Sequence, residues 1–196
     1  TTVEQSVQIE HAKFTFEQSP MQDLFSSMRG NSEFIGSVEI EKVGQGLNYA
    51  YPTELKRAYH REKEVQYLYD SLFQSKTKMA LAIVGEIGVG RHTLLEEAIW
   101  RYMEQSQNDR KSQFWLINPN RIIAGMSIVG MWQKRFEAIL EYAKQPYEKD
   151  KTADSIIFDN PIALLRIGKT SQNSMPLSNV LKPYLENRTL QTILIA

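Results

Sequence analysis

The chain has 196 residues, of which 42% are hydrophobic and 23% are charged. This length and apolar content suit one ordinary domain with a real core and exclude wholesale disorder. Lysine plus arginine and aspartate plus glutamate both count 23, which argues against a global polycationic mode of binding, so we expect no nucleic acid and no membrane as partner. The absence of cysteine excludes disulfides, zinc–thiolate sites and thiol nucleophiles. No apolar run approaches the roughly 20 residues that span a bilayer, and we expect a cytoplasmic protein.

Residues 1–50 carry the weakest pattern. Partial alternation at Phe34, Val38 and Ile40 predicts short extended segments, which follow a helix-like patch that Gly30 would stop. Glycines at positions 44 and 46 indicate a turn. We therefore expect residues 1–50 to form an N-terminal appendage or linker.

From residue 52 onward, apolar runs alternate with helical stripes. The first stripe opens at Pro52 and continues to Phe73. Four apolar runs predict strands, at residues 79–84, 114–117, 155–158 and 190–195. The first run is continuous and suits a strand buried on both faces. Three further stripes, between these runs, predict helices around residues 94–102, 132–143 and 177–185. This order predicts an α/β fold with a parallel sheet flanked by helices.

A glycine-rich loop, residues 85–90, lies between the first run and the next helical stripe. Three glycines in this loop allow consecutive N–H groups to point at one anion, and the following helix adds its positive end. The candidate ligand-binding residues are Gly85, Glu86, Ile87, Gly88, Val89, Gly90, Arg91, His92 and Thr93. A phosphate-binding loop of this spacing calls for Lys and then Ser or Thr, but Arg91 and His92 stand there. The loop alone fits a structural turn equally well.

Asp159 and Asn160 end the third apolar run. An Asp at the carboxyl edge of a parallel sheet could hold Mg²⁺ through water, so Asp159 is the candidate metal residue. Asn160 cannot accept a proton from water, so we expect no general-base catalysis and name no catalytic residue. Alone, this segment also fits an ordinary Asp-Asn-Pro turn. The three histidines show no metal-ligand spacing.

In combination these motifs resemble the first AAA+ module of Clp-type ring chaperones, the protein unfoldases and disaggregases. The resemblance covers residues 51–196, and its main matches are Arg61-Glu-Lys-Glu64, Gly85-Glu-Ile-Gly-Val-Gly90, Ile123-Ala-Gly125 with Gly130 and Arg135-Phe136, and Asn179-Val-Leu-Lys-Pro183. It implies the large subdomain of a P-loop NTPase, incomplete at its C-terminal end before the helical lid. It also implies ATP or ADP as ligand and protein partners in a homo- or hetero-oligomeric ring.

The departures from the family pattern fall on its chemical positions. Arg91-His92 replaces the Walker A Lys-Thr, and Asn160 replaces the Walker B Glu. Because an imidazole is a poor ligand for Mg²⁺, the sequence argues against this ion. Ile128 stands at the pore-loop aromatic, and Tyr59-His60 stands where the family has Ile-Gly near the adenine.

Three functions remain open from the sequence. The first is a degenerate module with weak or absent nucleotide binding and no hydrolysis, which supports a protein-remodelling ring. The second is an active ATP-dependent unfoldase module, in which Arg91 and Thr93 substitute for the usual residues and a partner subunit supplies the catalytic group. The third is a protein-interaction domain on a retired ATPase fold, with residues 1–50 as its docking element.

Overall fold

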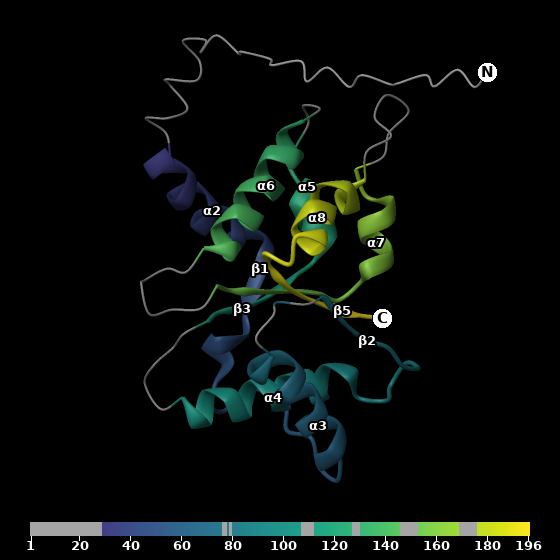
Figure 1. Cartoon of the computed structure of the whole chain (residues 1–196). Coiled ribbons are helices and arrows are strands. Elements are labelled where there is room, and N and C mark those ends of the chain that lie inside the picture. Colours follow the sequence, from purple (N-terminus) through teal and green to yellow (C-terminus); the bar gives the residue numbers. More distant parts are fainter. Residues whose placement is uncertain are drawn as a thin grey trace, which may run out of the picture.

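The fold has three layers, with a central sheet between two layers of helices (Figure 1). The computed structural model describes residues 29–75, 78, 80–106, 112–126, 130–145, 153–168 and 176–196. One layer of helices contains α2 (Arg29–Val43), α5 (Pro119–Ile123), α6 (Met131–Lys144), α7 (Pro161–Arg166) and α8 (Leu177–Glu186). The other contains α3 (Glu62–Tyr69) and α4 (Arg91–Gln105), together with the short turns η1 (Leu47–Ala50) and η2 (Asp70–Gln74).

The sheet has five strands in the order β1-β3-β4-β5-β2. The strands are β1 (Gly44–Gly46), β2 (Ala80–Ile83), β3 (Phe114–Ile117), β4 (Ser155–Phe158) and β5 (Gln191–Ile195). The last four pair in parallel, which confirms the fold predicted from the sequence. β1 was expected as a turn but pairs antiparallel with β3.

The core is divided by the sheet because side chains alternate along each strand. On β4, Ile156 and Phe158 pack with α6 and α8, while Ile157 packs with α4 on the opposite face. This strand is therefore buried on both faces and delivers Asp159 directly from the interior to the sheet edge.

β2 differs from the expected strand buried on both faces. It lies at the edge of the described sheet, next to β5 alone, with Ala80 and Ala82 exposed. Its side chains alternate between exposed and half-buried, so one face of β2 is more covered than the other.

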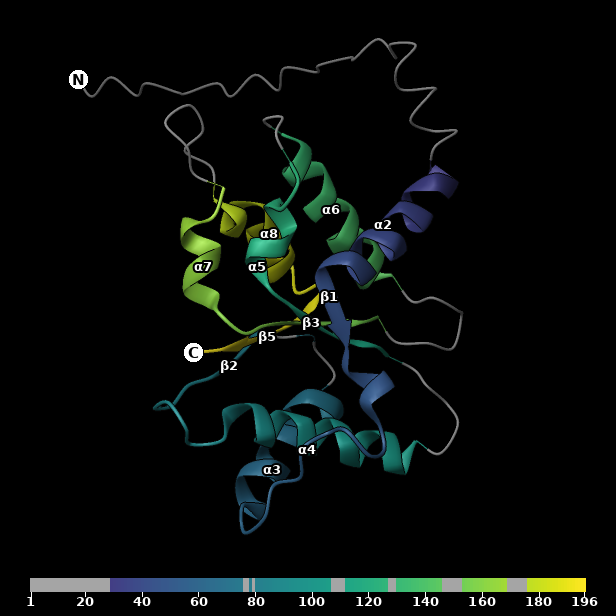
Figure 2. The same ribbon diagram turned by 180° about the vertical axis from the view of Figure 1, so that it is seen from behind.

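The interpretation of residues 34–40 as extended is wrong. These residues lie within α2, which runs through Gly30 and Gly36 and packs along α6 (Figure 2). Ile40 and Val43 on this helix are buried with the α6 side chains. The described part of the first 50 residues therefore packs into the same core as the sheet, while the division of the chain at residue 50 stays a prediction.

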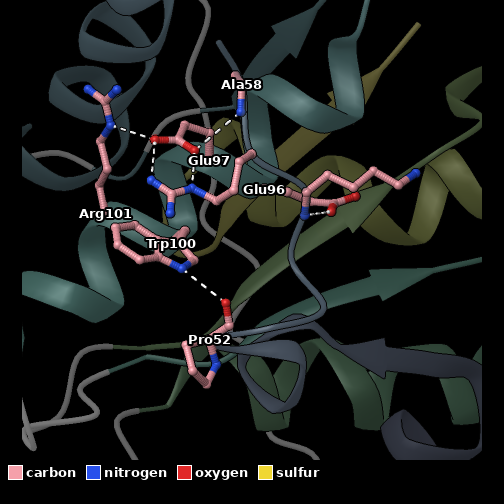
Figure 3. A network of polar contacts seen from close by, with 8 residues as sticks. Pro52, Ala58, Glu96, Glu97, Trp100 and Arg101 are labelled. Carbon is pink, nitrogen blue, oxygen red and sulfur yellow. Dashed lines mark hydrogen bonds and ion pairs between the residues drawn. The ribbon is translucent and has the colours of Figure 1, made fainter.

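The helix expected to open at Pro52 begins only at Glu62. Before it, residues 51–61 form an irregular segment along α4, which we call the strap (Figure 3). Within the parts of the chain that the structure describes, no helix is long and apolar enough to cross a membrane.

Candidate functional site

The glycine-rich loop connects β2 to α4, as the sequence predicted. Gly88 and Gly90 both have φ of 88°, a left-handed conformation in which residues with a side chain are strained. At Gly85 an added Cβ would lie 2.9 Å from Cγ2 of Val89, so the tight curl of the loop requires glycine there. These three positions explain why the loop sequence is rich in glycine.

The loop leaves the start of α4 open. Gly90 is the N-cap residue, and no side chain there accepts a hydrogen bond from the first helical N–H groups. Glu86 and Ile87 are exposed at the tip of the loop, and Thr93 lies half-buried in the first turn of the helix. Free N–H groups at a helix start, with the positive end of the helix dipole, favour an anion.

Arg91 lies at the opening of this loop. Cγ and Cδ of its side chain run past Gly85, at 3.6 and 3.5 Å from the position of an added Cβ. Among the described residues, no carboxylate forms an ion pair with its guanidinium. Arg91 therefore offers a positive charge at the place where a phosphate-binding loop carries its lysine.

His92 and Asp159 are in direct contact, although they are 67 residues apart in the sequence. The Nε2 atom of His92 lies 2.6 Å from Oδ1 of Asp159, and both side chains are partly exposed. Since an ionised carboxylate only accepts, a proton on Nε2 of the imidazole joins the two groups. The contact bridges the first turn of α4 and the end of β4.

This arrangement does not fit Mg²⁺. The ion prefers six oxygen ligands in a regular octahedron, and here Asp159 faces an imidazole nitrogen instead of a hydroxyl. Within the described ranges there is no cluster of three or more histidine, cysteine or acidic side chains that could hold a metal ion. The role of Asp159 as a metal residue stays a prediction that these neighbours do not support.

Asn160 has a structural partner. Its Oδ1 atom accepts a hydrogen bond of 3.1 Å from the N–H of Ala163, which makes Asn160 the N-cap of α7. Pro161 follows at the first helical position, where its missing N–H costs nothing. The Asn-Pro pair therefore starts a helix, and the amide is engaged away from any water-activating role.

A charged network on α4 was missed by the sequence reasoning. Glu97 is only 2% exposed, and its carboxylate accepts hydrogen bonds from Arg57, Arg101 and the N–H of Ala58 (Figure 3). Burial alone would raise the pKa of Glu97, but these three donors outweigh it and hold the pKa below its ordinary value. The sequence carries no local signal for this network, because Glu97 lies beside the apolar stripe of the helix and not on it.

The remaining candidate residues lie apart from the loop or outside the described part. Tyr59 and His60 belong to the strap, where the Tyr59 ring is exposed and His60 has a positive φ of 60°. Ile128 lies outside the described residues. Nearby, Gly130 is the N-cap of α6, and Arg135 donates to the carbonyls of Ile122 and Ala124 at the end of α5.

A separate groove lies between α6 and α8, and none of the glycine-loop residues lines it. On its wall, the Tyr184 hydroxyl donates to Glu141 at 2.7 Å. Burial, with this hydrogen bond, raises the pKa of Tyr184. The groove is therefore structurally independent of the candidate phosphate site.

Comparison with known proteins finds relatives of this chain among the ClpB chaperones. The chain is 27% identical to the chaperone protein ClpB of Malacoplasma penetrans over 158 residues, which covers 79% of this chain and 22% of that protein. ClpB of Aquifex aeolicus is 24% identical over 157 residues, covering 79% of this chain and 15% of the relative. The chain thus spans about a fifth of the length of these relatives. No protein-family model matches it.

Solved structures show the same fold. The Hsp104–ADP complex of Saccharomyces cerevisiae matches with a TM-score of 0.61 at 18% identity, over 80% of this chain and 21% of that one. The extended Hsp104:casein complex of the same organism matches with a TM-score of 0.63 at 19% identity, over 81% of this chain and 26% of that one.

The fold and the glycine-rich loop together define an AAA+ large subdomain of the P-loop type. The resemblance to Clp-type ring chaperones is confirmed, because the chain is homologous to ClpB over about four fifths of its length and shares the Hsp104 fold. The chain is therefore similar to an AAA+ module of the ClpB and Hsp104 chaperones.

Proposed function

We propose that this module binds adenine nucleotide weakly through its phosphates, does not hydrolyse it, and has a structural or regulatory role in a protein-remodelling ring. The phosphate ligands are the first N–H groups of α4 and the Arg91 guanidinium. A P-loop ATPase needs two further functions, a held Mg²⁺ and a base or polarising group for water. The geometry of this chain supports neither of them.

The contact between His92 and Asp159 carries this proposal. It joins the two side chains that would have to share a metal ion, at 2.6 Å, and so fills the space between them with a hydrogen bond. A bound cation would have to break this contact and then coordinate an imidazole, which suits borderline metals better than Mg²⁺. Asn160 adds to the argument because its side chain caps α7.

The proposal on partners is supported by one of the relatives. One solved relative is a complex of Hsp104 with casein, a protein ligand. We propose that this chain likewise works within an oligomeric ring on protein substrates, where active modules supply the hydrolysis. The cytoplasmic location and the grip of Ile128 on a translocating polypeptide stay predictions.

Calorimetric titration of the chain with ADP and with ATP, each with and without Mg²⁺, tests the proposal. We expect micromolar or weaker binding that Mg²⁺ does not tighten, and no phosphate release. A variant combining Arg91→Lys, His92→Thr and Asn160→Glu should gain Mg²⁺-dependent affinity because it regains the hydroxyl ligand. His92→Ala is the matched control, since it removes the contact with Asp159 without supplying a hydroxyl.

Two results would decide against the proposal. Turnover by the unmodified chain that Asp159→Ala abolishes would show an active ATPase with non-standard residues. No binding of either nucleotide at millimolar concentration would favour the protein-interaction domain instead.

A further inference from the structure

Glu97 is a charged residue that is buried beneath the strap. It lies on a different face of α4 from Leu95 and Ile99, which are buried against the sheet. A carboxylate at 2% exposure persists at such a position only with partners that compensate its desolvation. Here the partners include two guanidinium groups and one backbone N–H.

Two of these partners belong to the strap. Arg57 donates from Nε to Oε2 of Glu97 at 2.6 Å, and the N–H of Ala58 donates to the same oxygen at 3.3 Å. The Arg57 guanidinium also stacks on Trp100, with Cζ 3.5 Å from the ring centroid. The carboxylate, the cation and the indole together fix the middle of the strap to the middle of α4.

The strap runs antiparallel to α4 and ends at the glycine-rich loop. Its first contact is the Tyr51 hydroxyl with Glu104 near the end of the helix, and the next is the Pro52 carbonyl with Nε1 of Trp100. The last is Arg61, whose guanidinium donates to the carbonyl of Val89 at 3.3 Å. The strap therefore connects the buried Glu97 to the backbone of the loop.

The contact between Arg61 and the Val89 carbonyl acts on the backbone conformation of the loop. Val89 lies between Gly88 and Gly90, which both have a positive φ, so rotation of either peptide would turn the loop N–H groups away from an anion. A guanidinium on this carbonyl favours one orientation of the loop over the others. The order of the loop thus depends on the position of Arg61, which is set by the strap and by an ion pair with Glu64 at 2.7 Å.

We propose that Glu97 is a positioning residue for the glycine-rich loop, acting through the strap and Arg61 without touching the ligand. This inference rests on the proposed phosphate binding and identifies the contacts that hold the glycine-rich loop in its binding conformation. Two acceptor oxygens are essential to it, because an amide of the same shape keeps only one oxygen, and its NH2 group would face a guanidinium donor in either orientation.

The test compares Glu97→Gln with the unmodified chain by calorimetric titration with ADP and with pyrophosphate. We expect affinity for both ligands to fall about tenfold, since both are held by the same loop. Arg101→Gln is the matched control, because Arg101 binds Glu97 from within α4 and is not part of the strap. It should change neither affinity by more than about twofold.

A double-mutant cycle separates positioning from a general loss of stability. In an Arg61→Gln background, Glu97→Gln should cause no further loss of ligand affinity, because the connection to Val89 is already cut. The same cycle measured by urea denaturation should be close to additive. Equal losses of affinity from Glu97→Gln in both backgrounds would overturn the proposal.

Hydrogen exchange keeps the inference testable if the chain binds neither ligand and the proposed function fails. In Glu97→Gln, exchange at the N–H groups of Ala58 and Val89 should accelerate, while exchange in β4 stays unchanged. Unchanged exchange at Val89 would refute the positioning role whatever the ligand titrations show.

Discussion

Two carboxylates with hydrogen-bond partners on α4 differ in burial, and the contrast separates the framework of the fold from the candidate site. Glu97 is 2% exposed and accepts from two arginines and one backbone N–H. Asp159 is 54% exposed, and its hydrogen-bond partner among the described residues is one imidazole. The first has the many partners typical of a group that holds the fold together, whereas the second can exchange its partner for water or a ligand at little cost.

The contrast predicts that the two carboxylates contribute very different amounts to the free energy of unfolding. Glu97→Ala should lower the free energy of unfolding by about 2–4 kcal/mol, because it unfastens the strap and leaves two guanidinium groups without their anion. Urea denaturation measures this loss. Glu96→Ala is the control, since the hydrogen bond that Glu96 accepts from the N–H of Lys56 is exposed. A loss below about 0.5 kcal/mol for Glu97→Ala would remove the distinction between the two groups.

Acid should remove the stability that the charge of Glu97 contributes. The pKa of Glu97 lies below its ordinary value of 4.5, because the hydrogen bonds from Arg57, Arg101 and Ala58 outweigh the effect of burial, which would raise it. A depressed pKa contributes stability that is fully present above pH 4.5 and is lost as pH falls through the folded pKa. The difference in unfolding free energy between the unmodified chain and Glu97→Gln should therefore shrink as pH falls below this value.

Comparison with the variant isolates Glu97 from other groups that titrate in the same direction. Glu39 and Glu141 also have lowered pKa values, each because hydrogen bonds and charges from basic or hydroxyl groups outweigh burial. Their contributions are the same in both proteins and cancel in the difference. A difference that does not change with pH would contradict the charged state assigned to Glu97.

The framework was predictable where the signal is local. β4 and β5 followed from short apolar runs, and the open loop followed from its glycines. α2 was missed because its glycines argue against a helix. In the structure an added Cβ on Gly36 would lie 2.5 Å from the carbonyl oxygen of Ala138, so this glycine permits close contact with α6. That reason lies in tertiary packing and leaves no local trace.

The sequence allowed the residues of the candidate site to be predicted, but not the contacts between them. The sequence identified His92 and Asp159 separately, as a lost hydroxyl and a retained carboxylate, and their hydrogen bond spans 67 residues. Glu97 was not identified, because Arg57 lies 40 residues away and no local spacing connects the two. Partners that meet only through the packing of the strap on α4 need coordinates to be found.

The smallest effect on stability is expected where the sequence departs most from an active ATPase. His92→Ala and Asp159→Ala should each change the free energy of unfolding by less than about 0.5 kcal/mol, because an exposed pair is well solvated. The double variant should show a coupling energy within about 1 kcal/mol. Urea denaturation of the four proteins in the cycle measures both quantities.

A larger coupling would reverse the assignment of the two carboxylates. If His92 and Asp159 were coupled by several kcal/mol, their contact would hold α4 to β4 as part of the framework, and no ligand could break it readily. With weak coupling, the pair only occupies the place of a metal ion. An anion could then bind at the start of α4 without breaking the contact between His92 and Asp159. The coupling energy therefore distinguishes two cases. In one, the site has lost its catalytic groups but can still bind a ligand; in the other, the same residues now stabilise the fold.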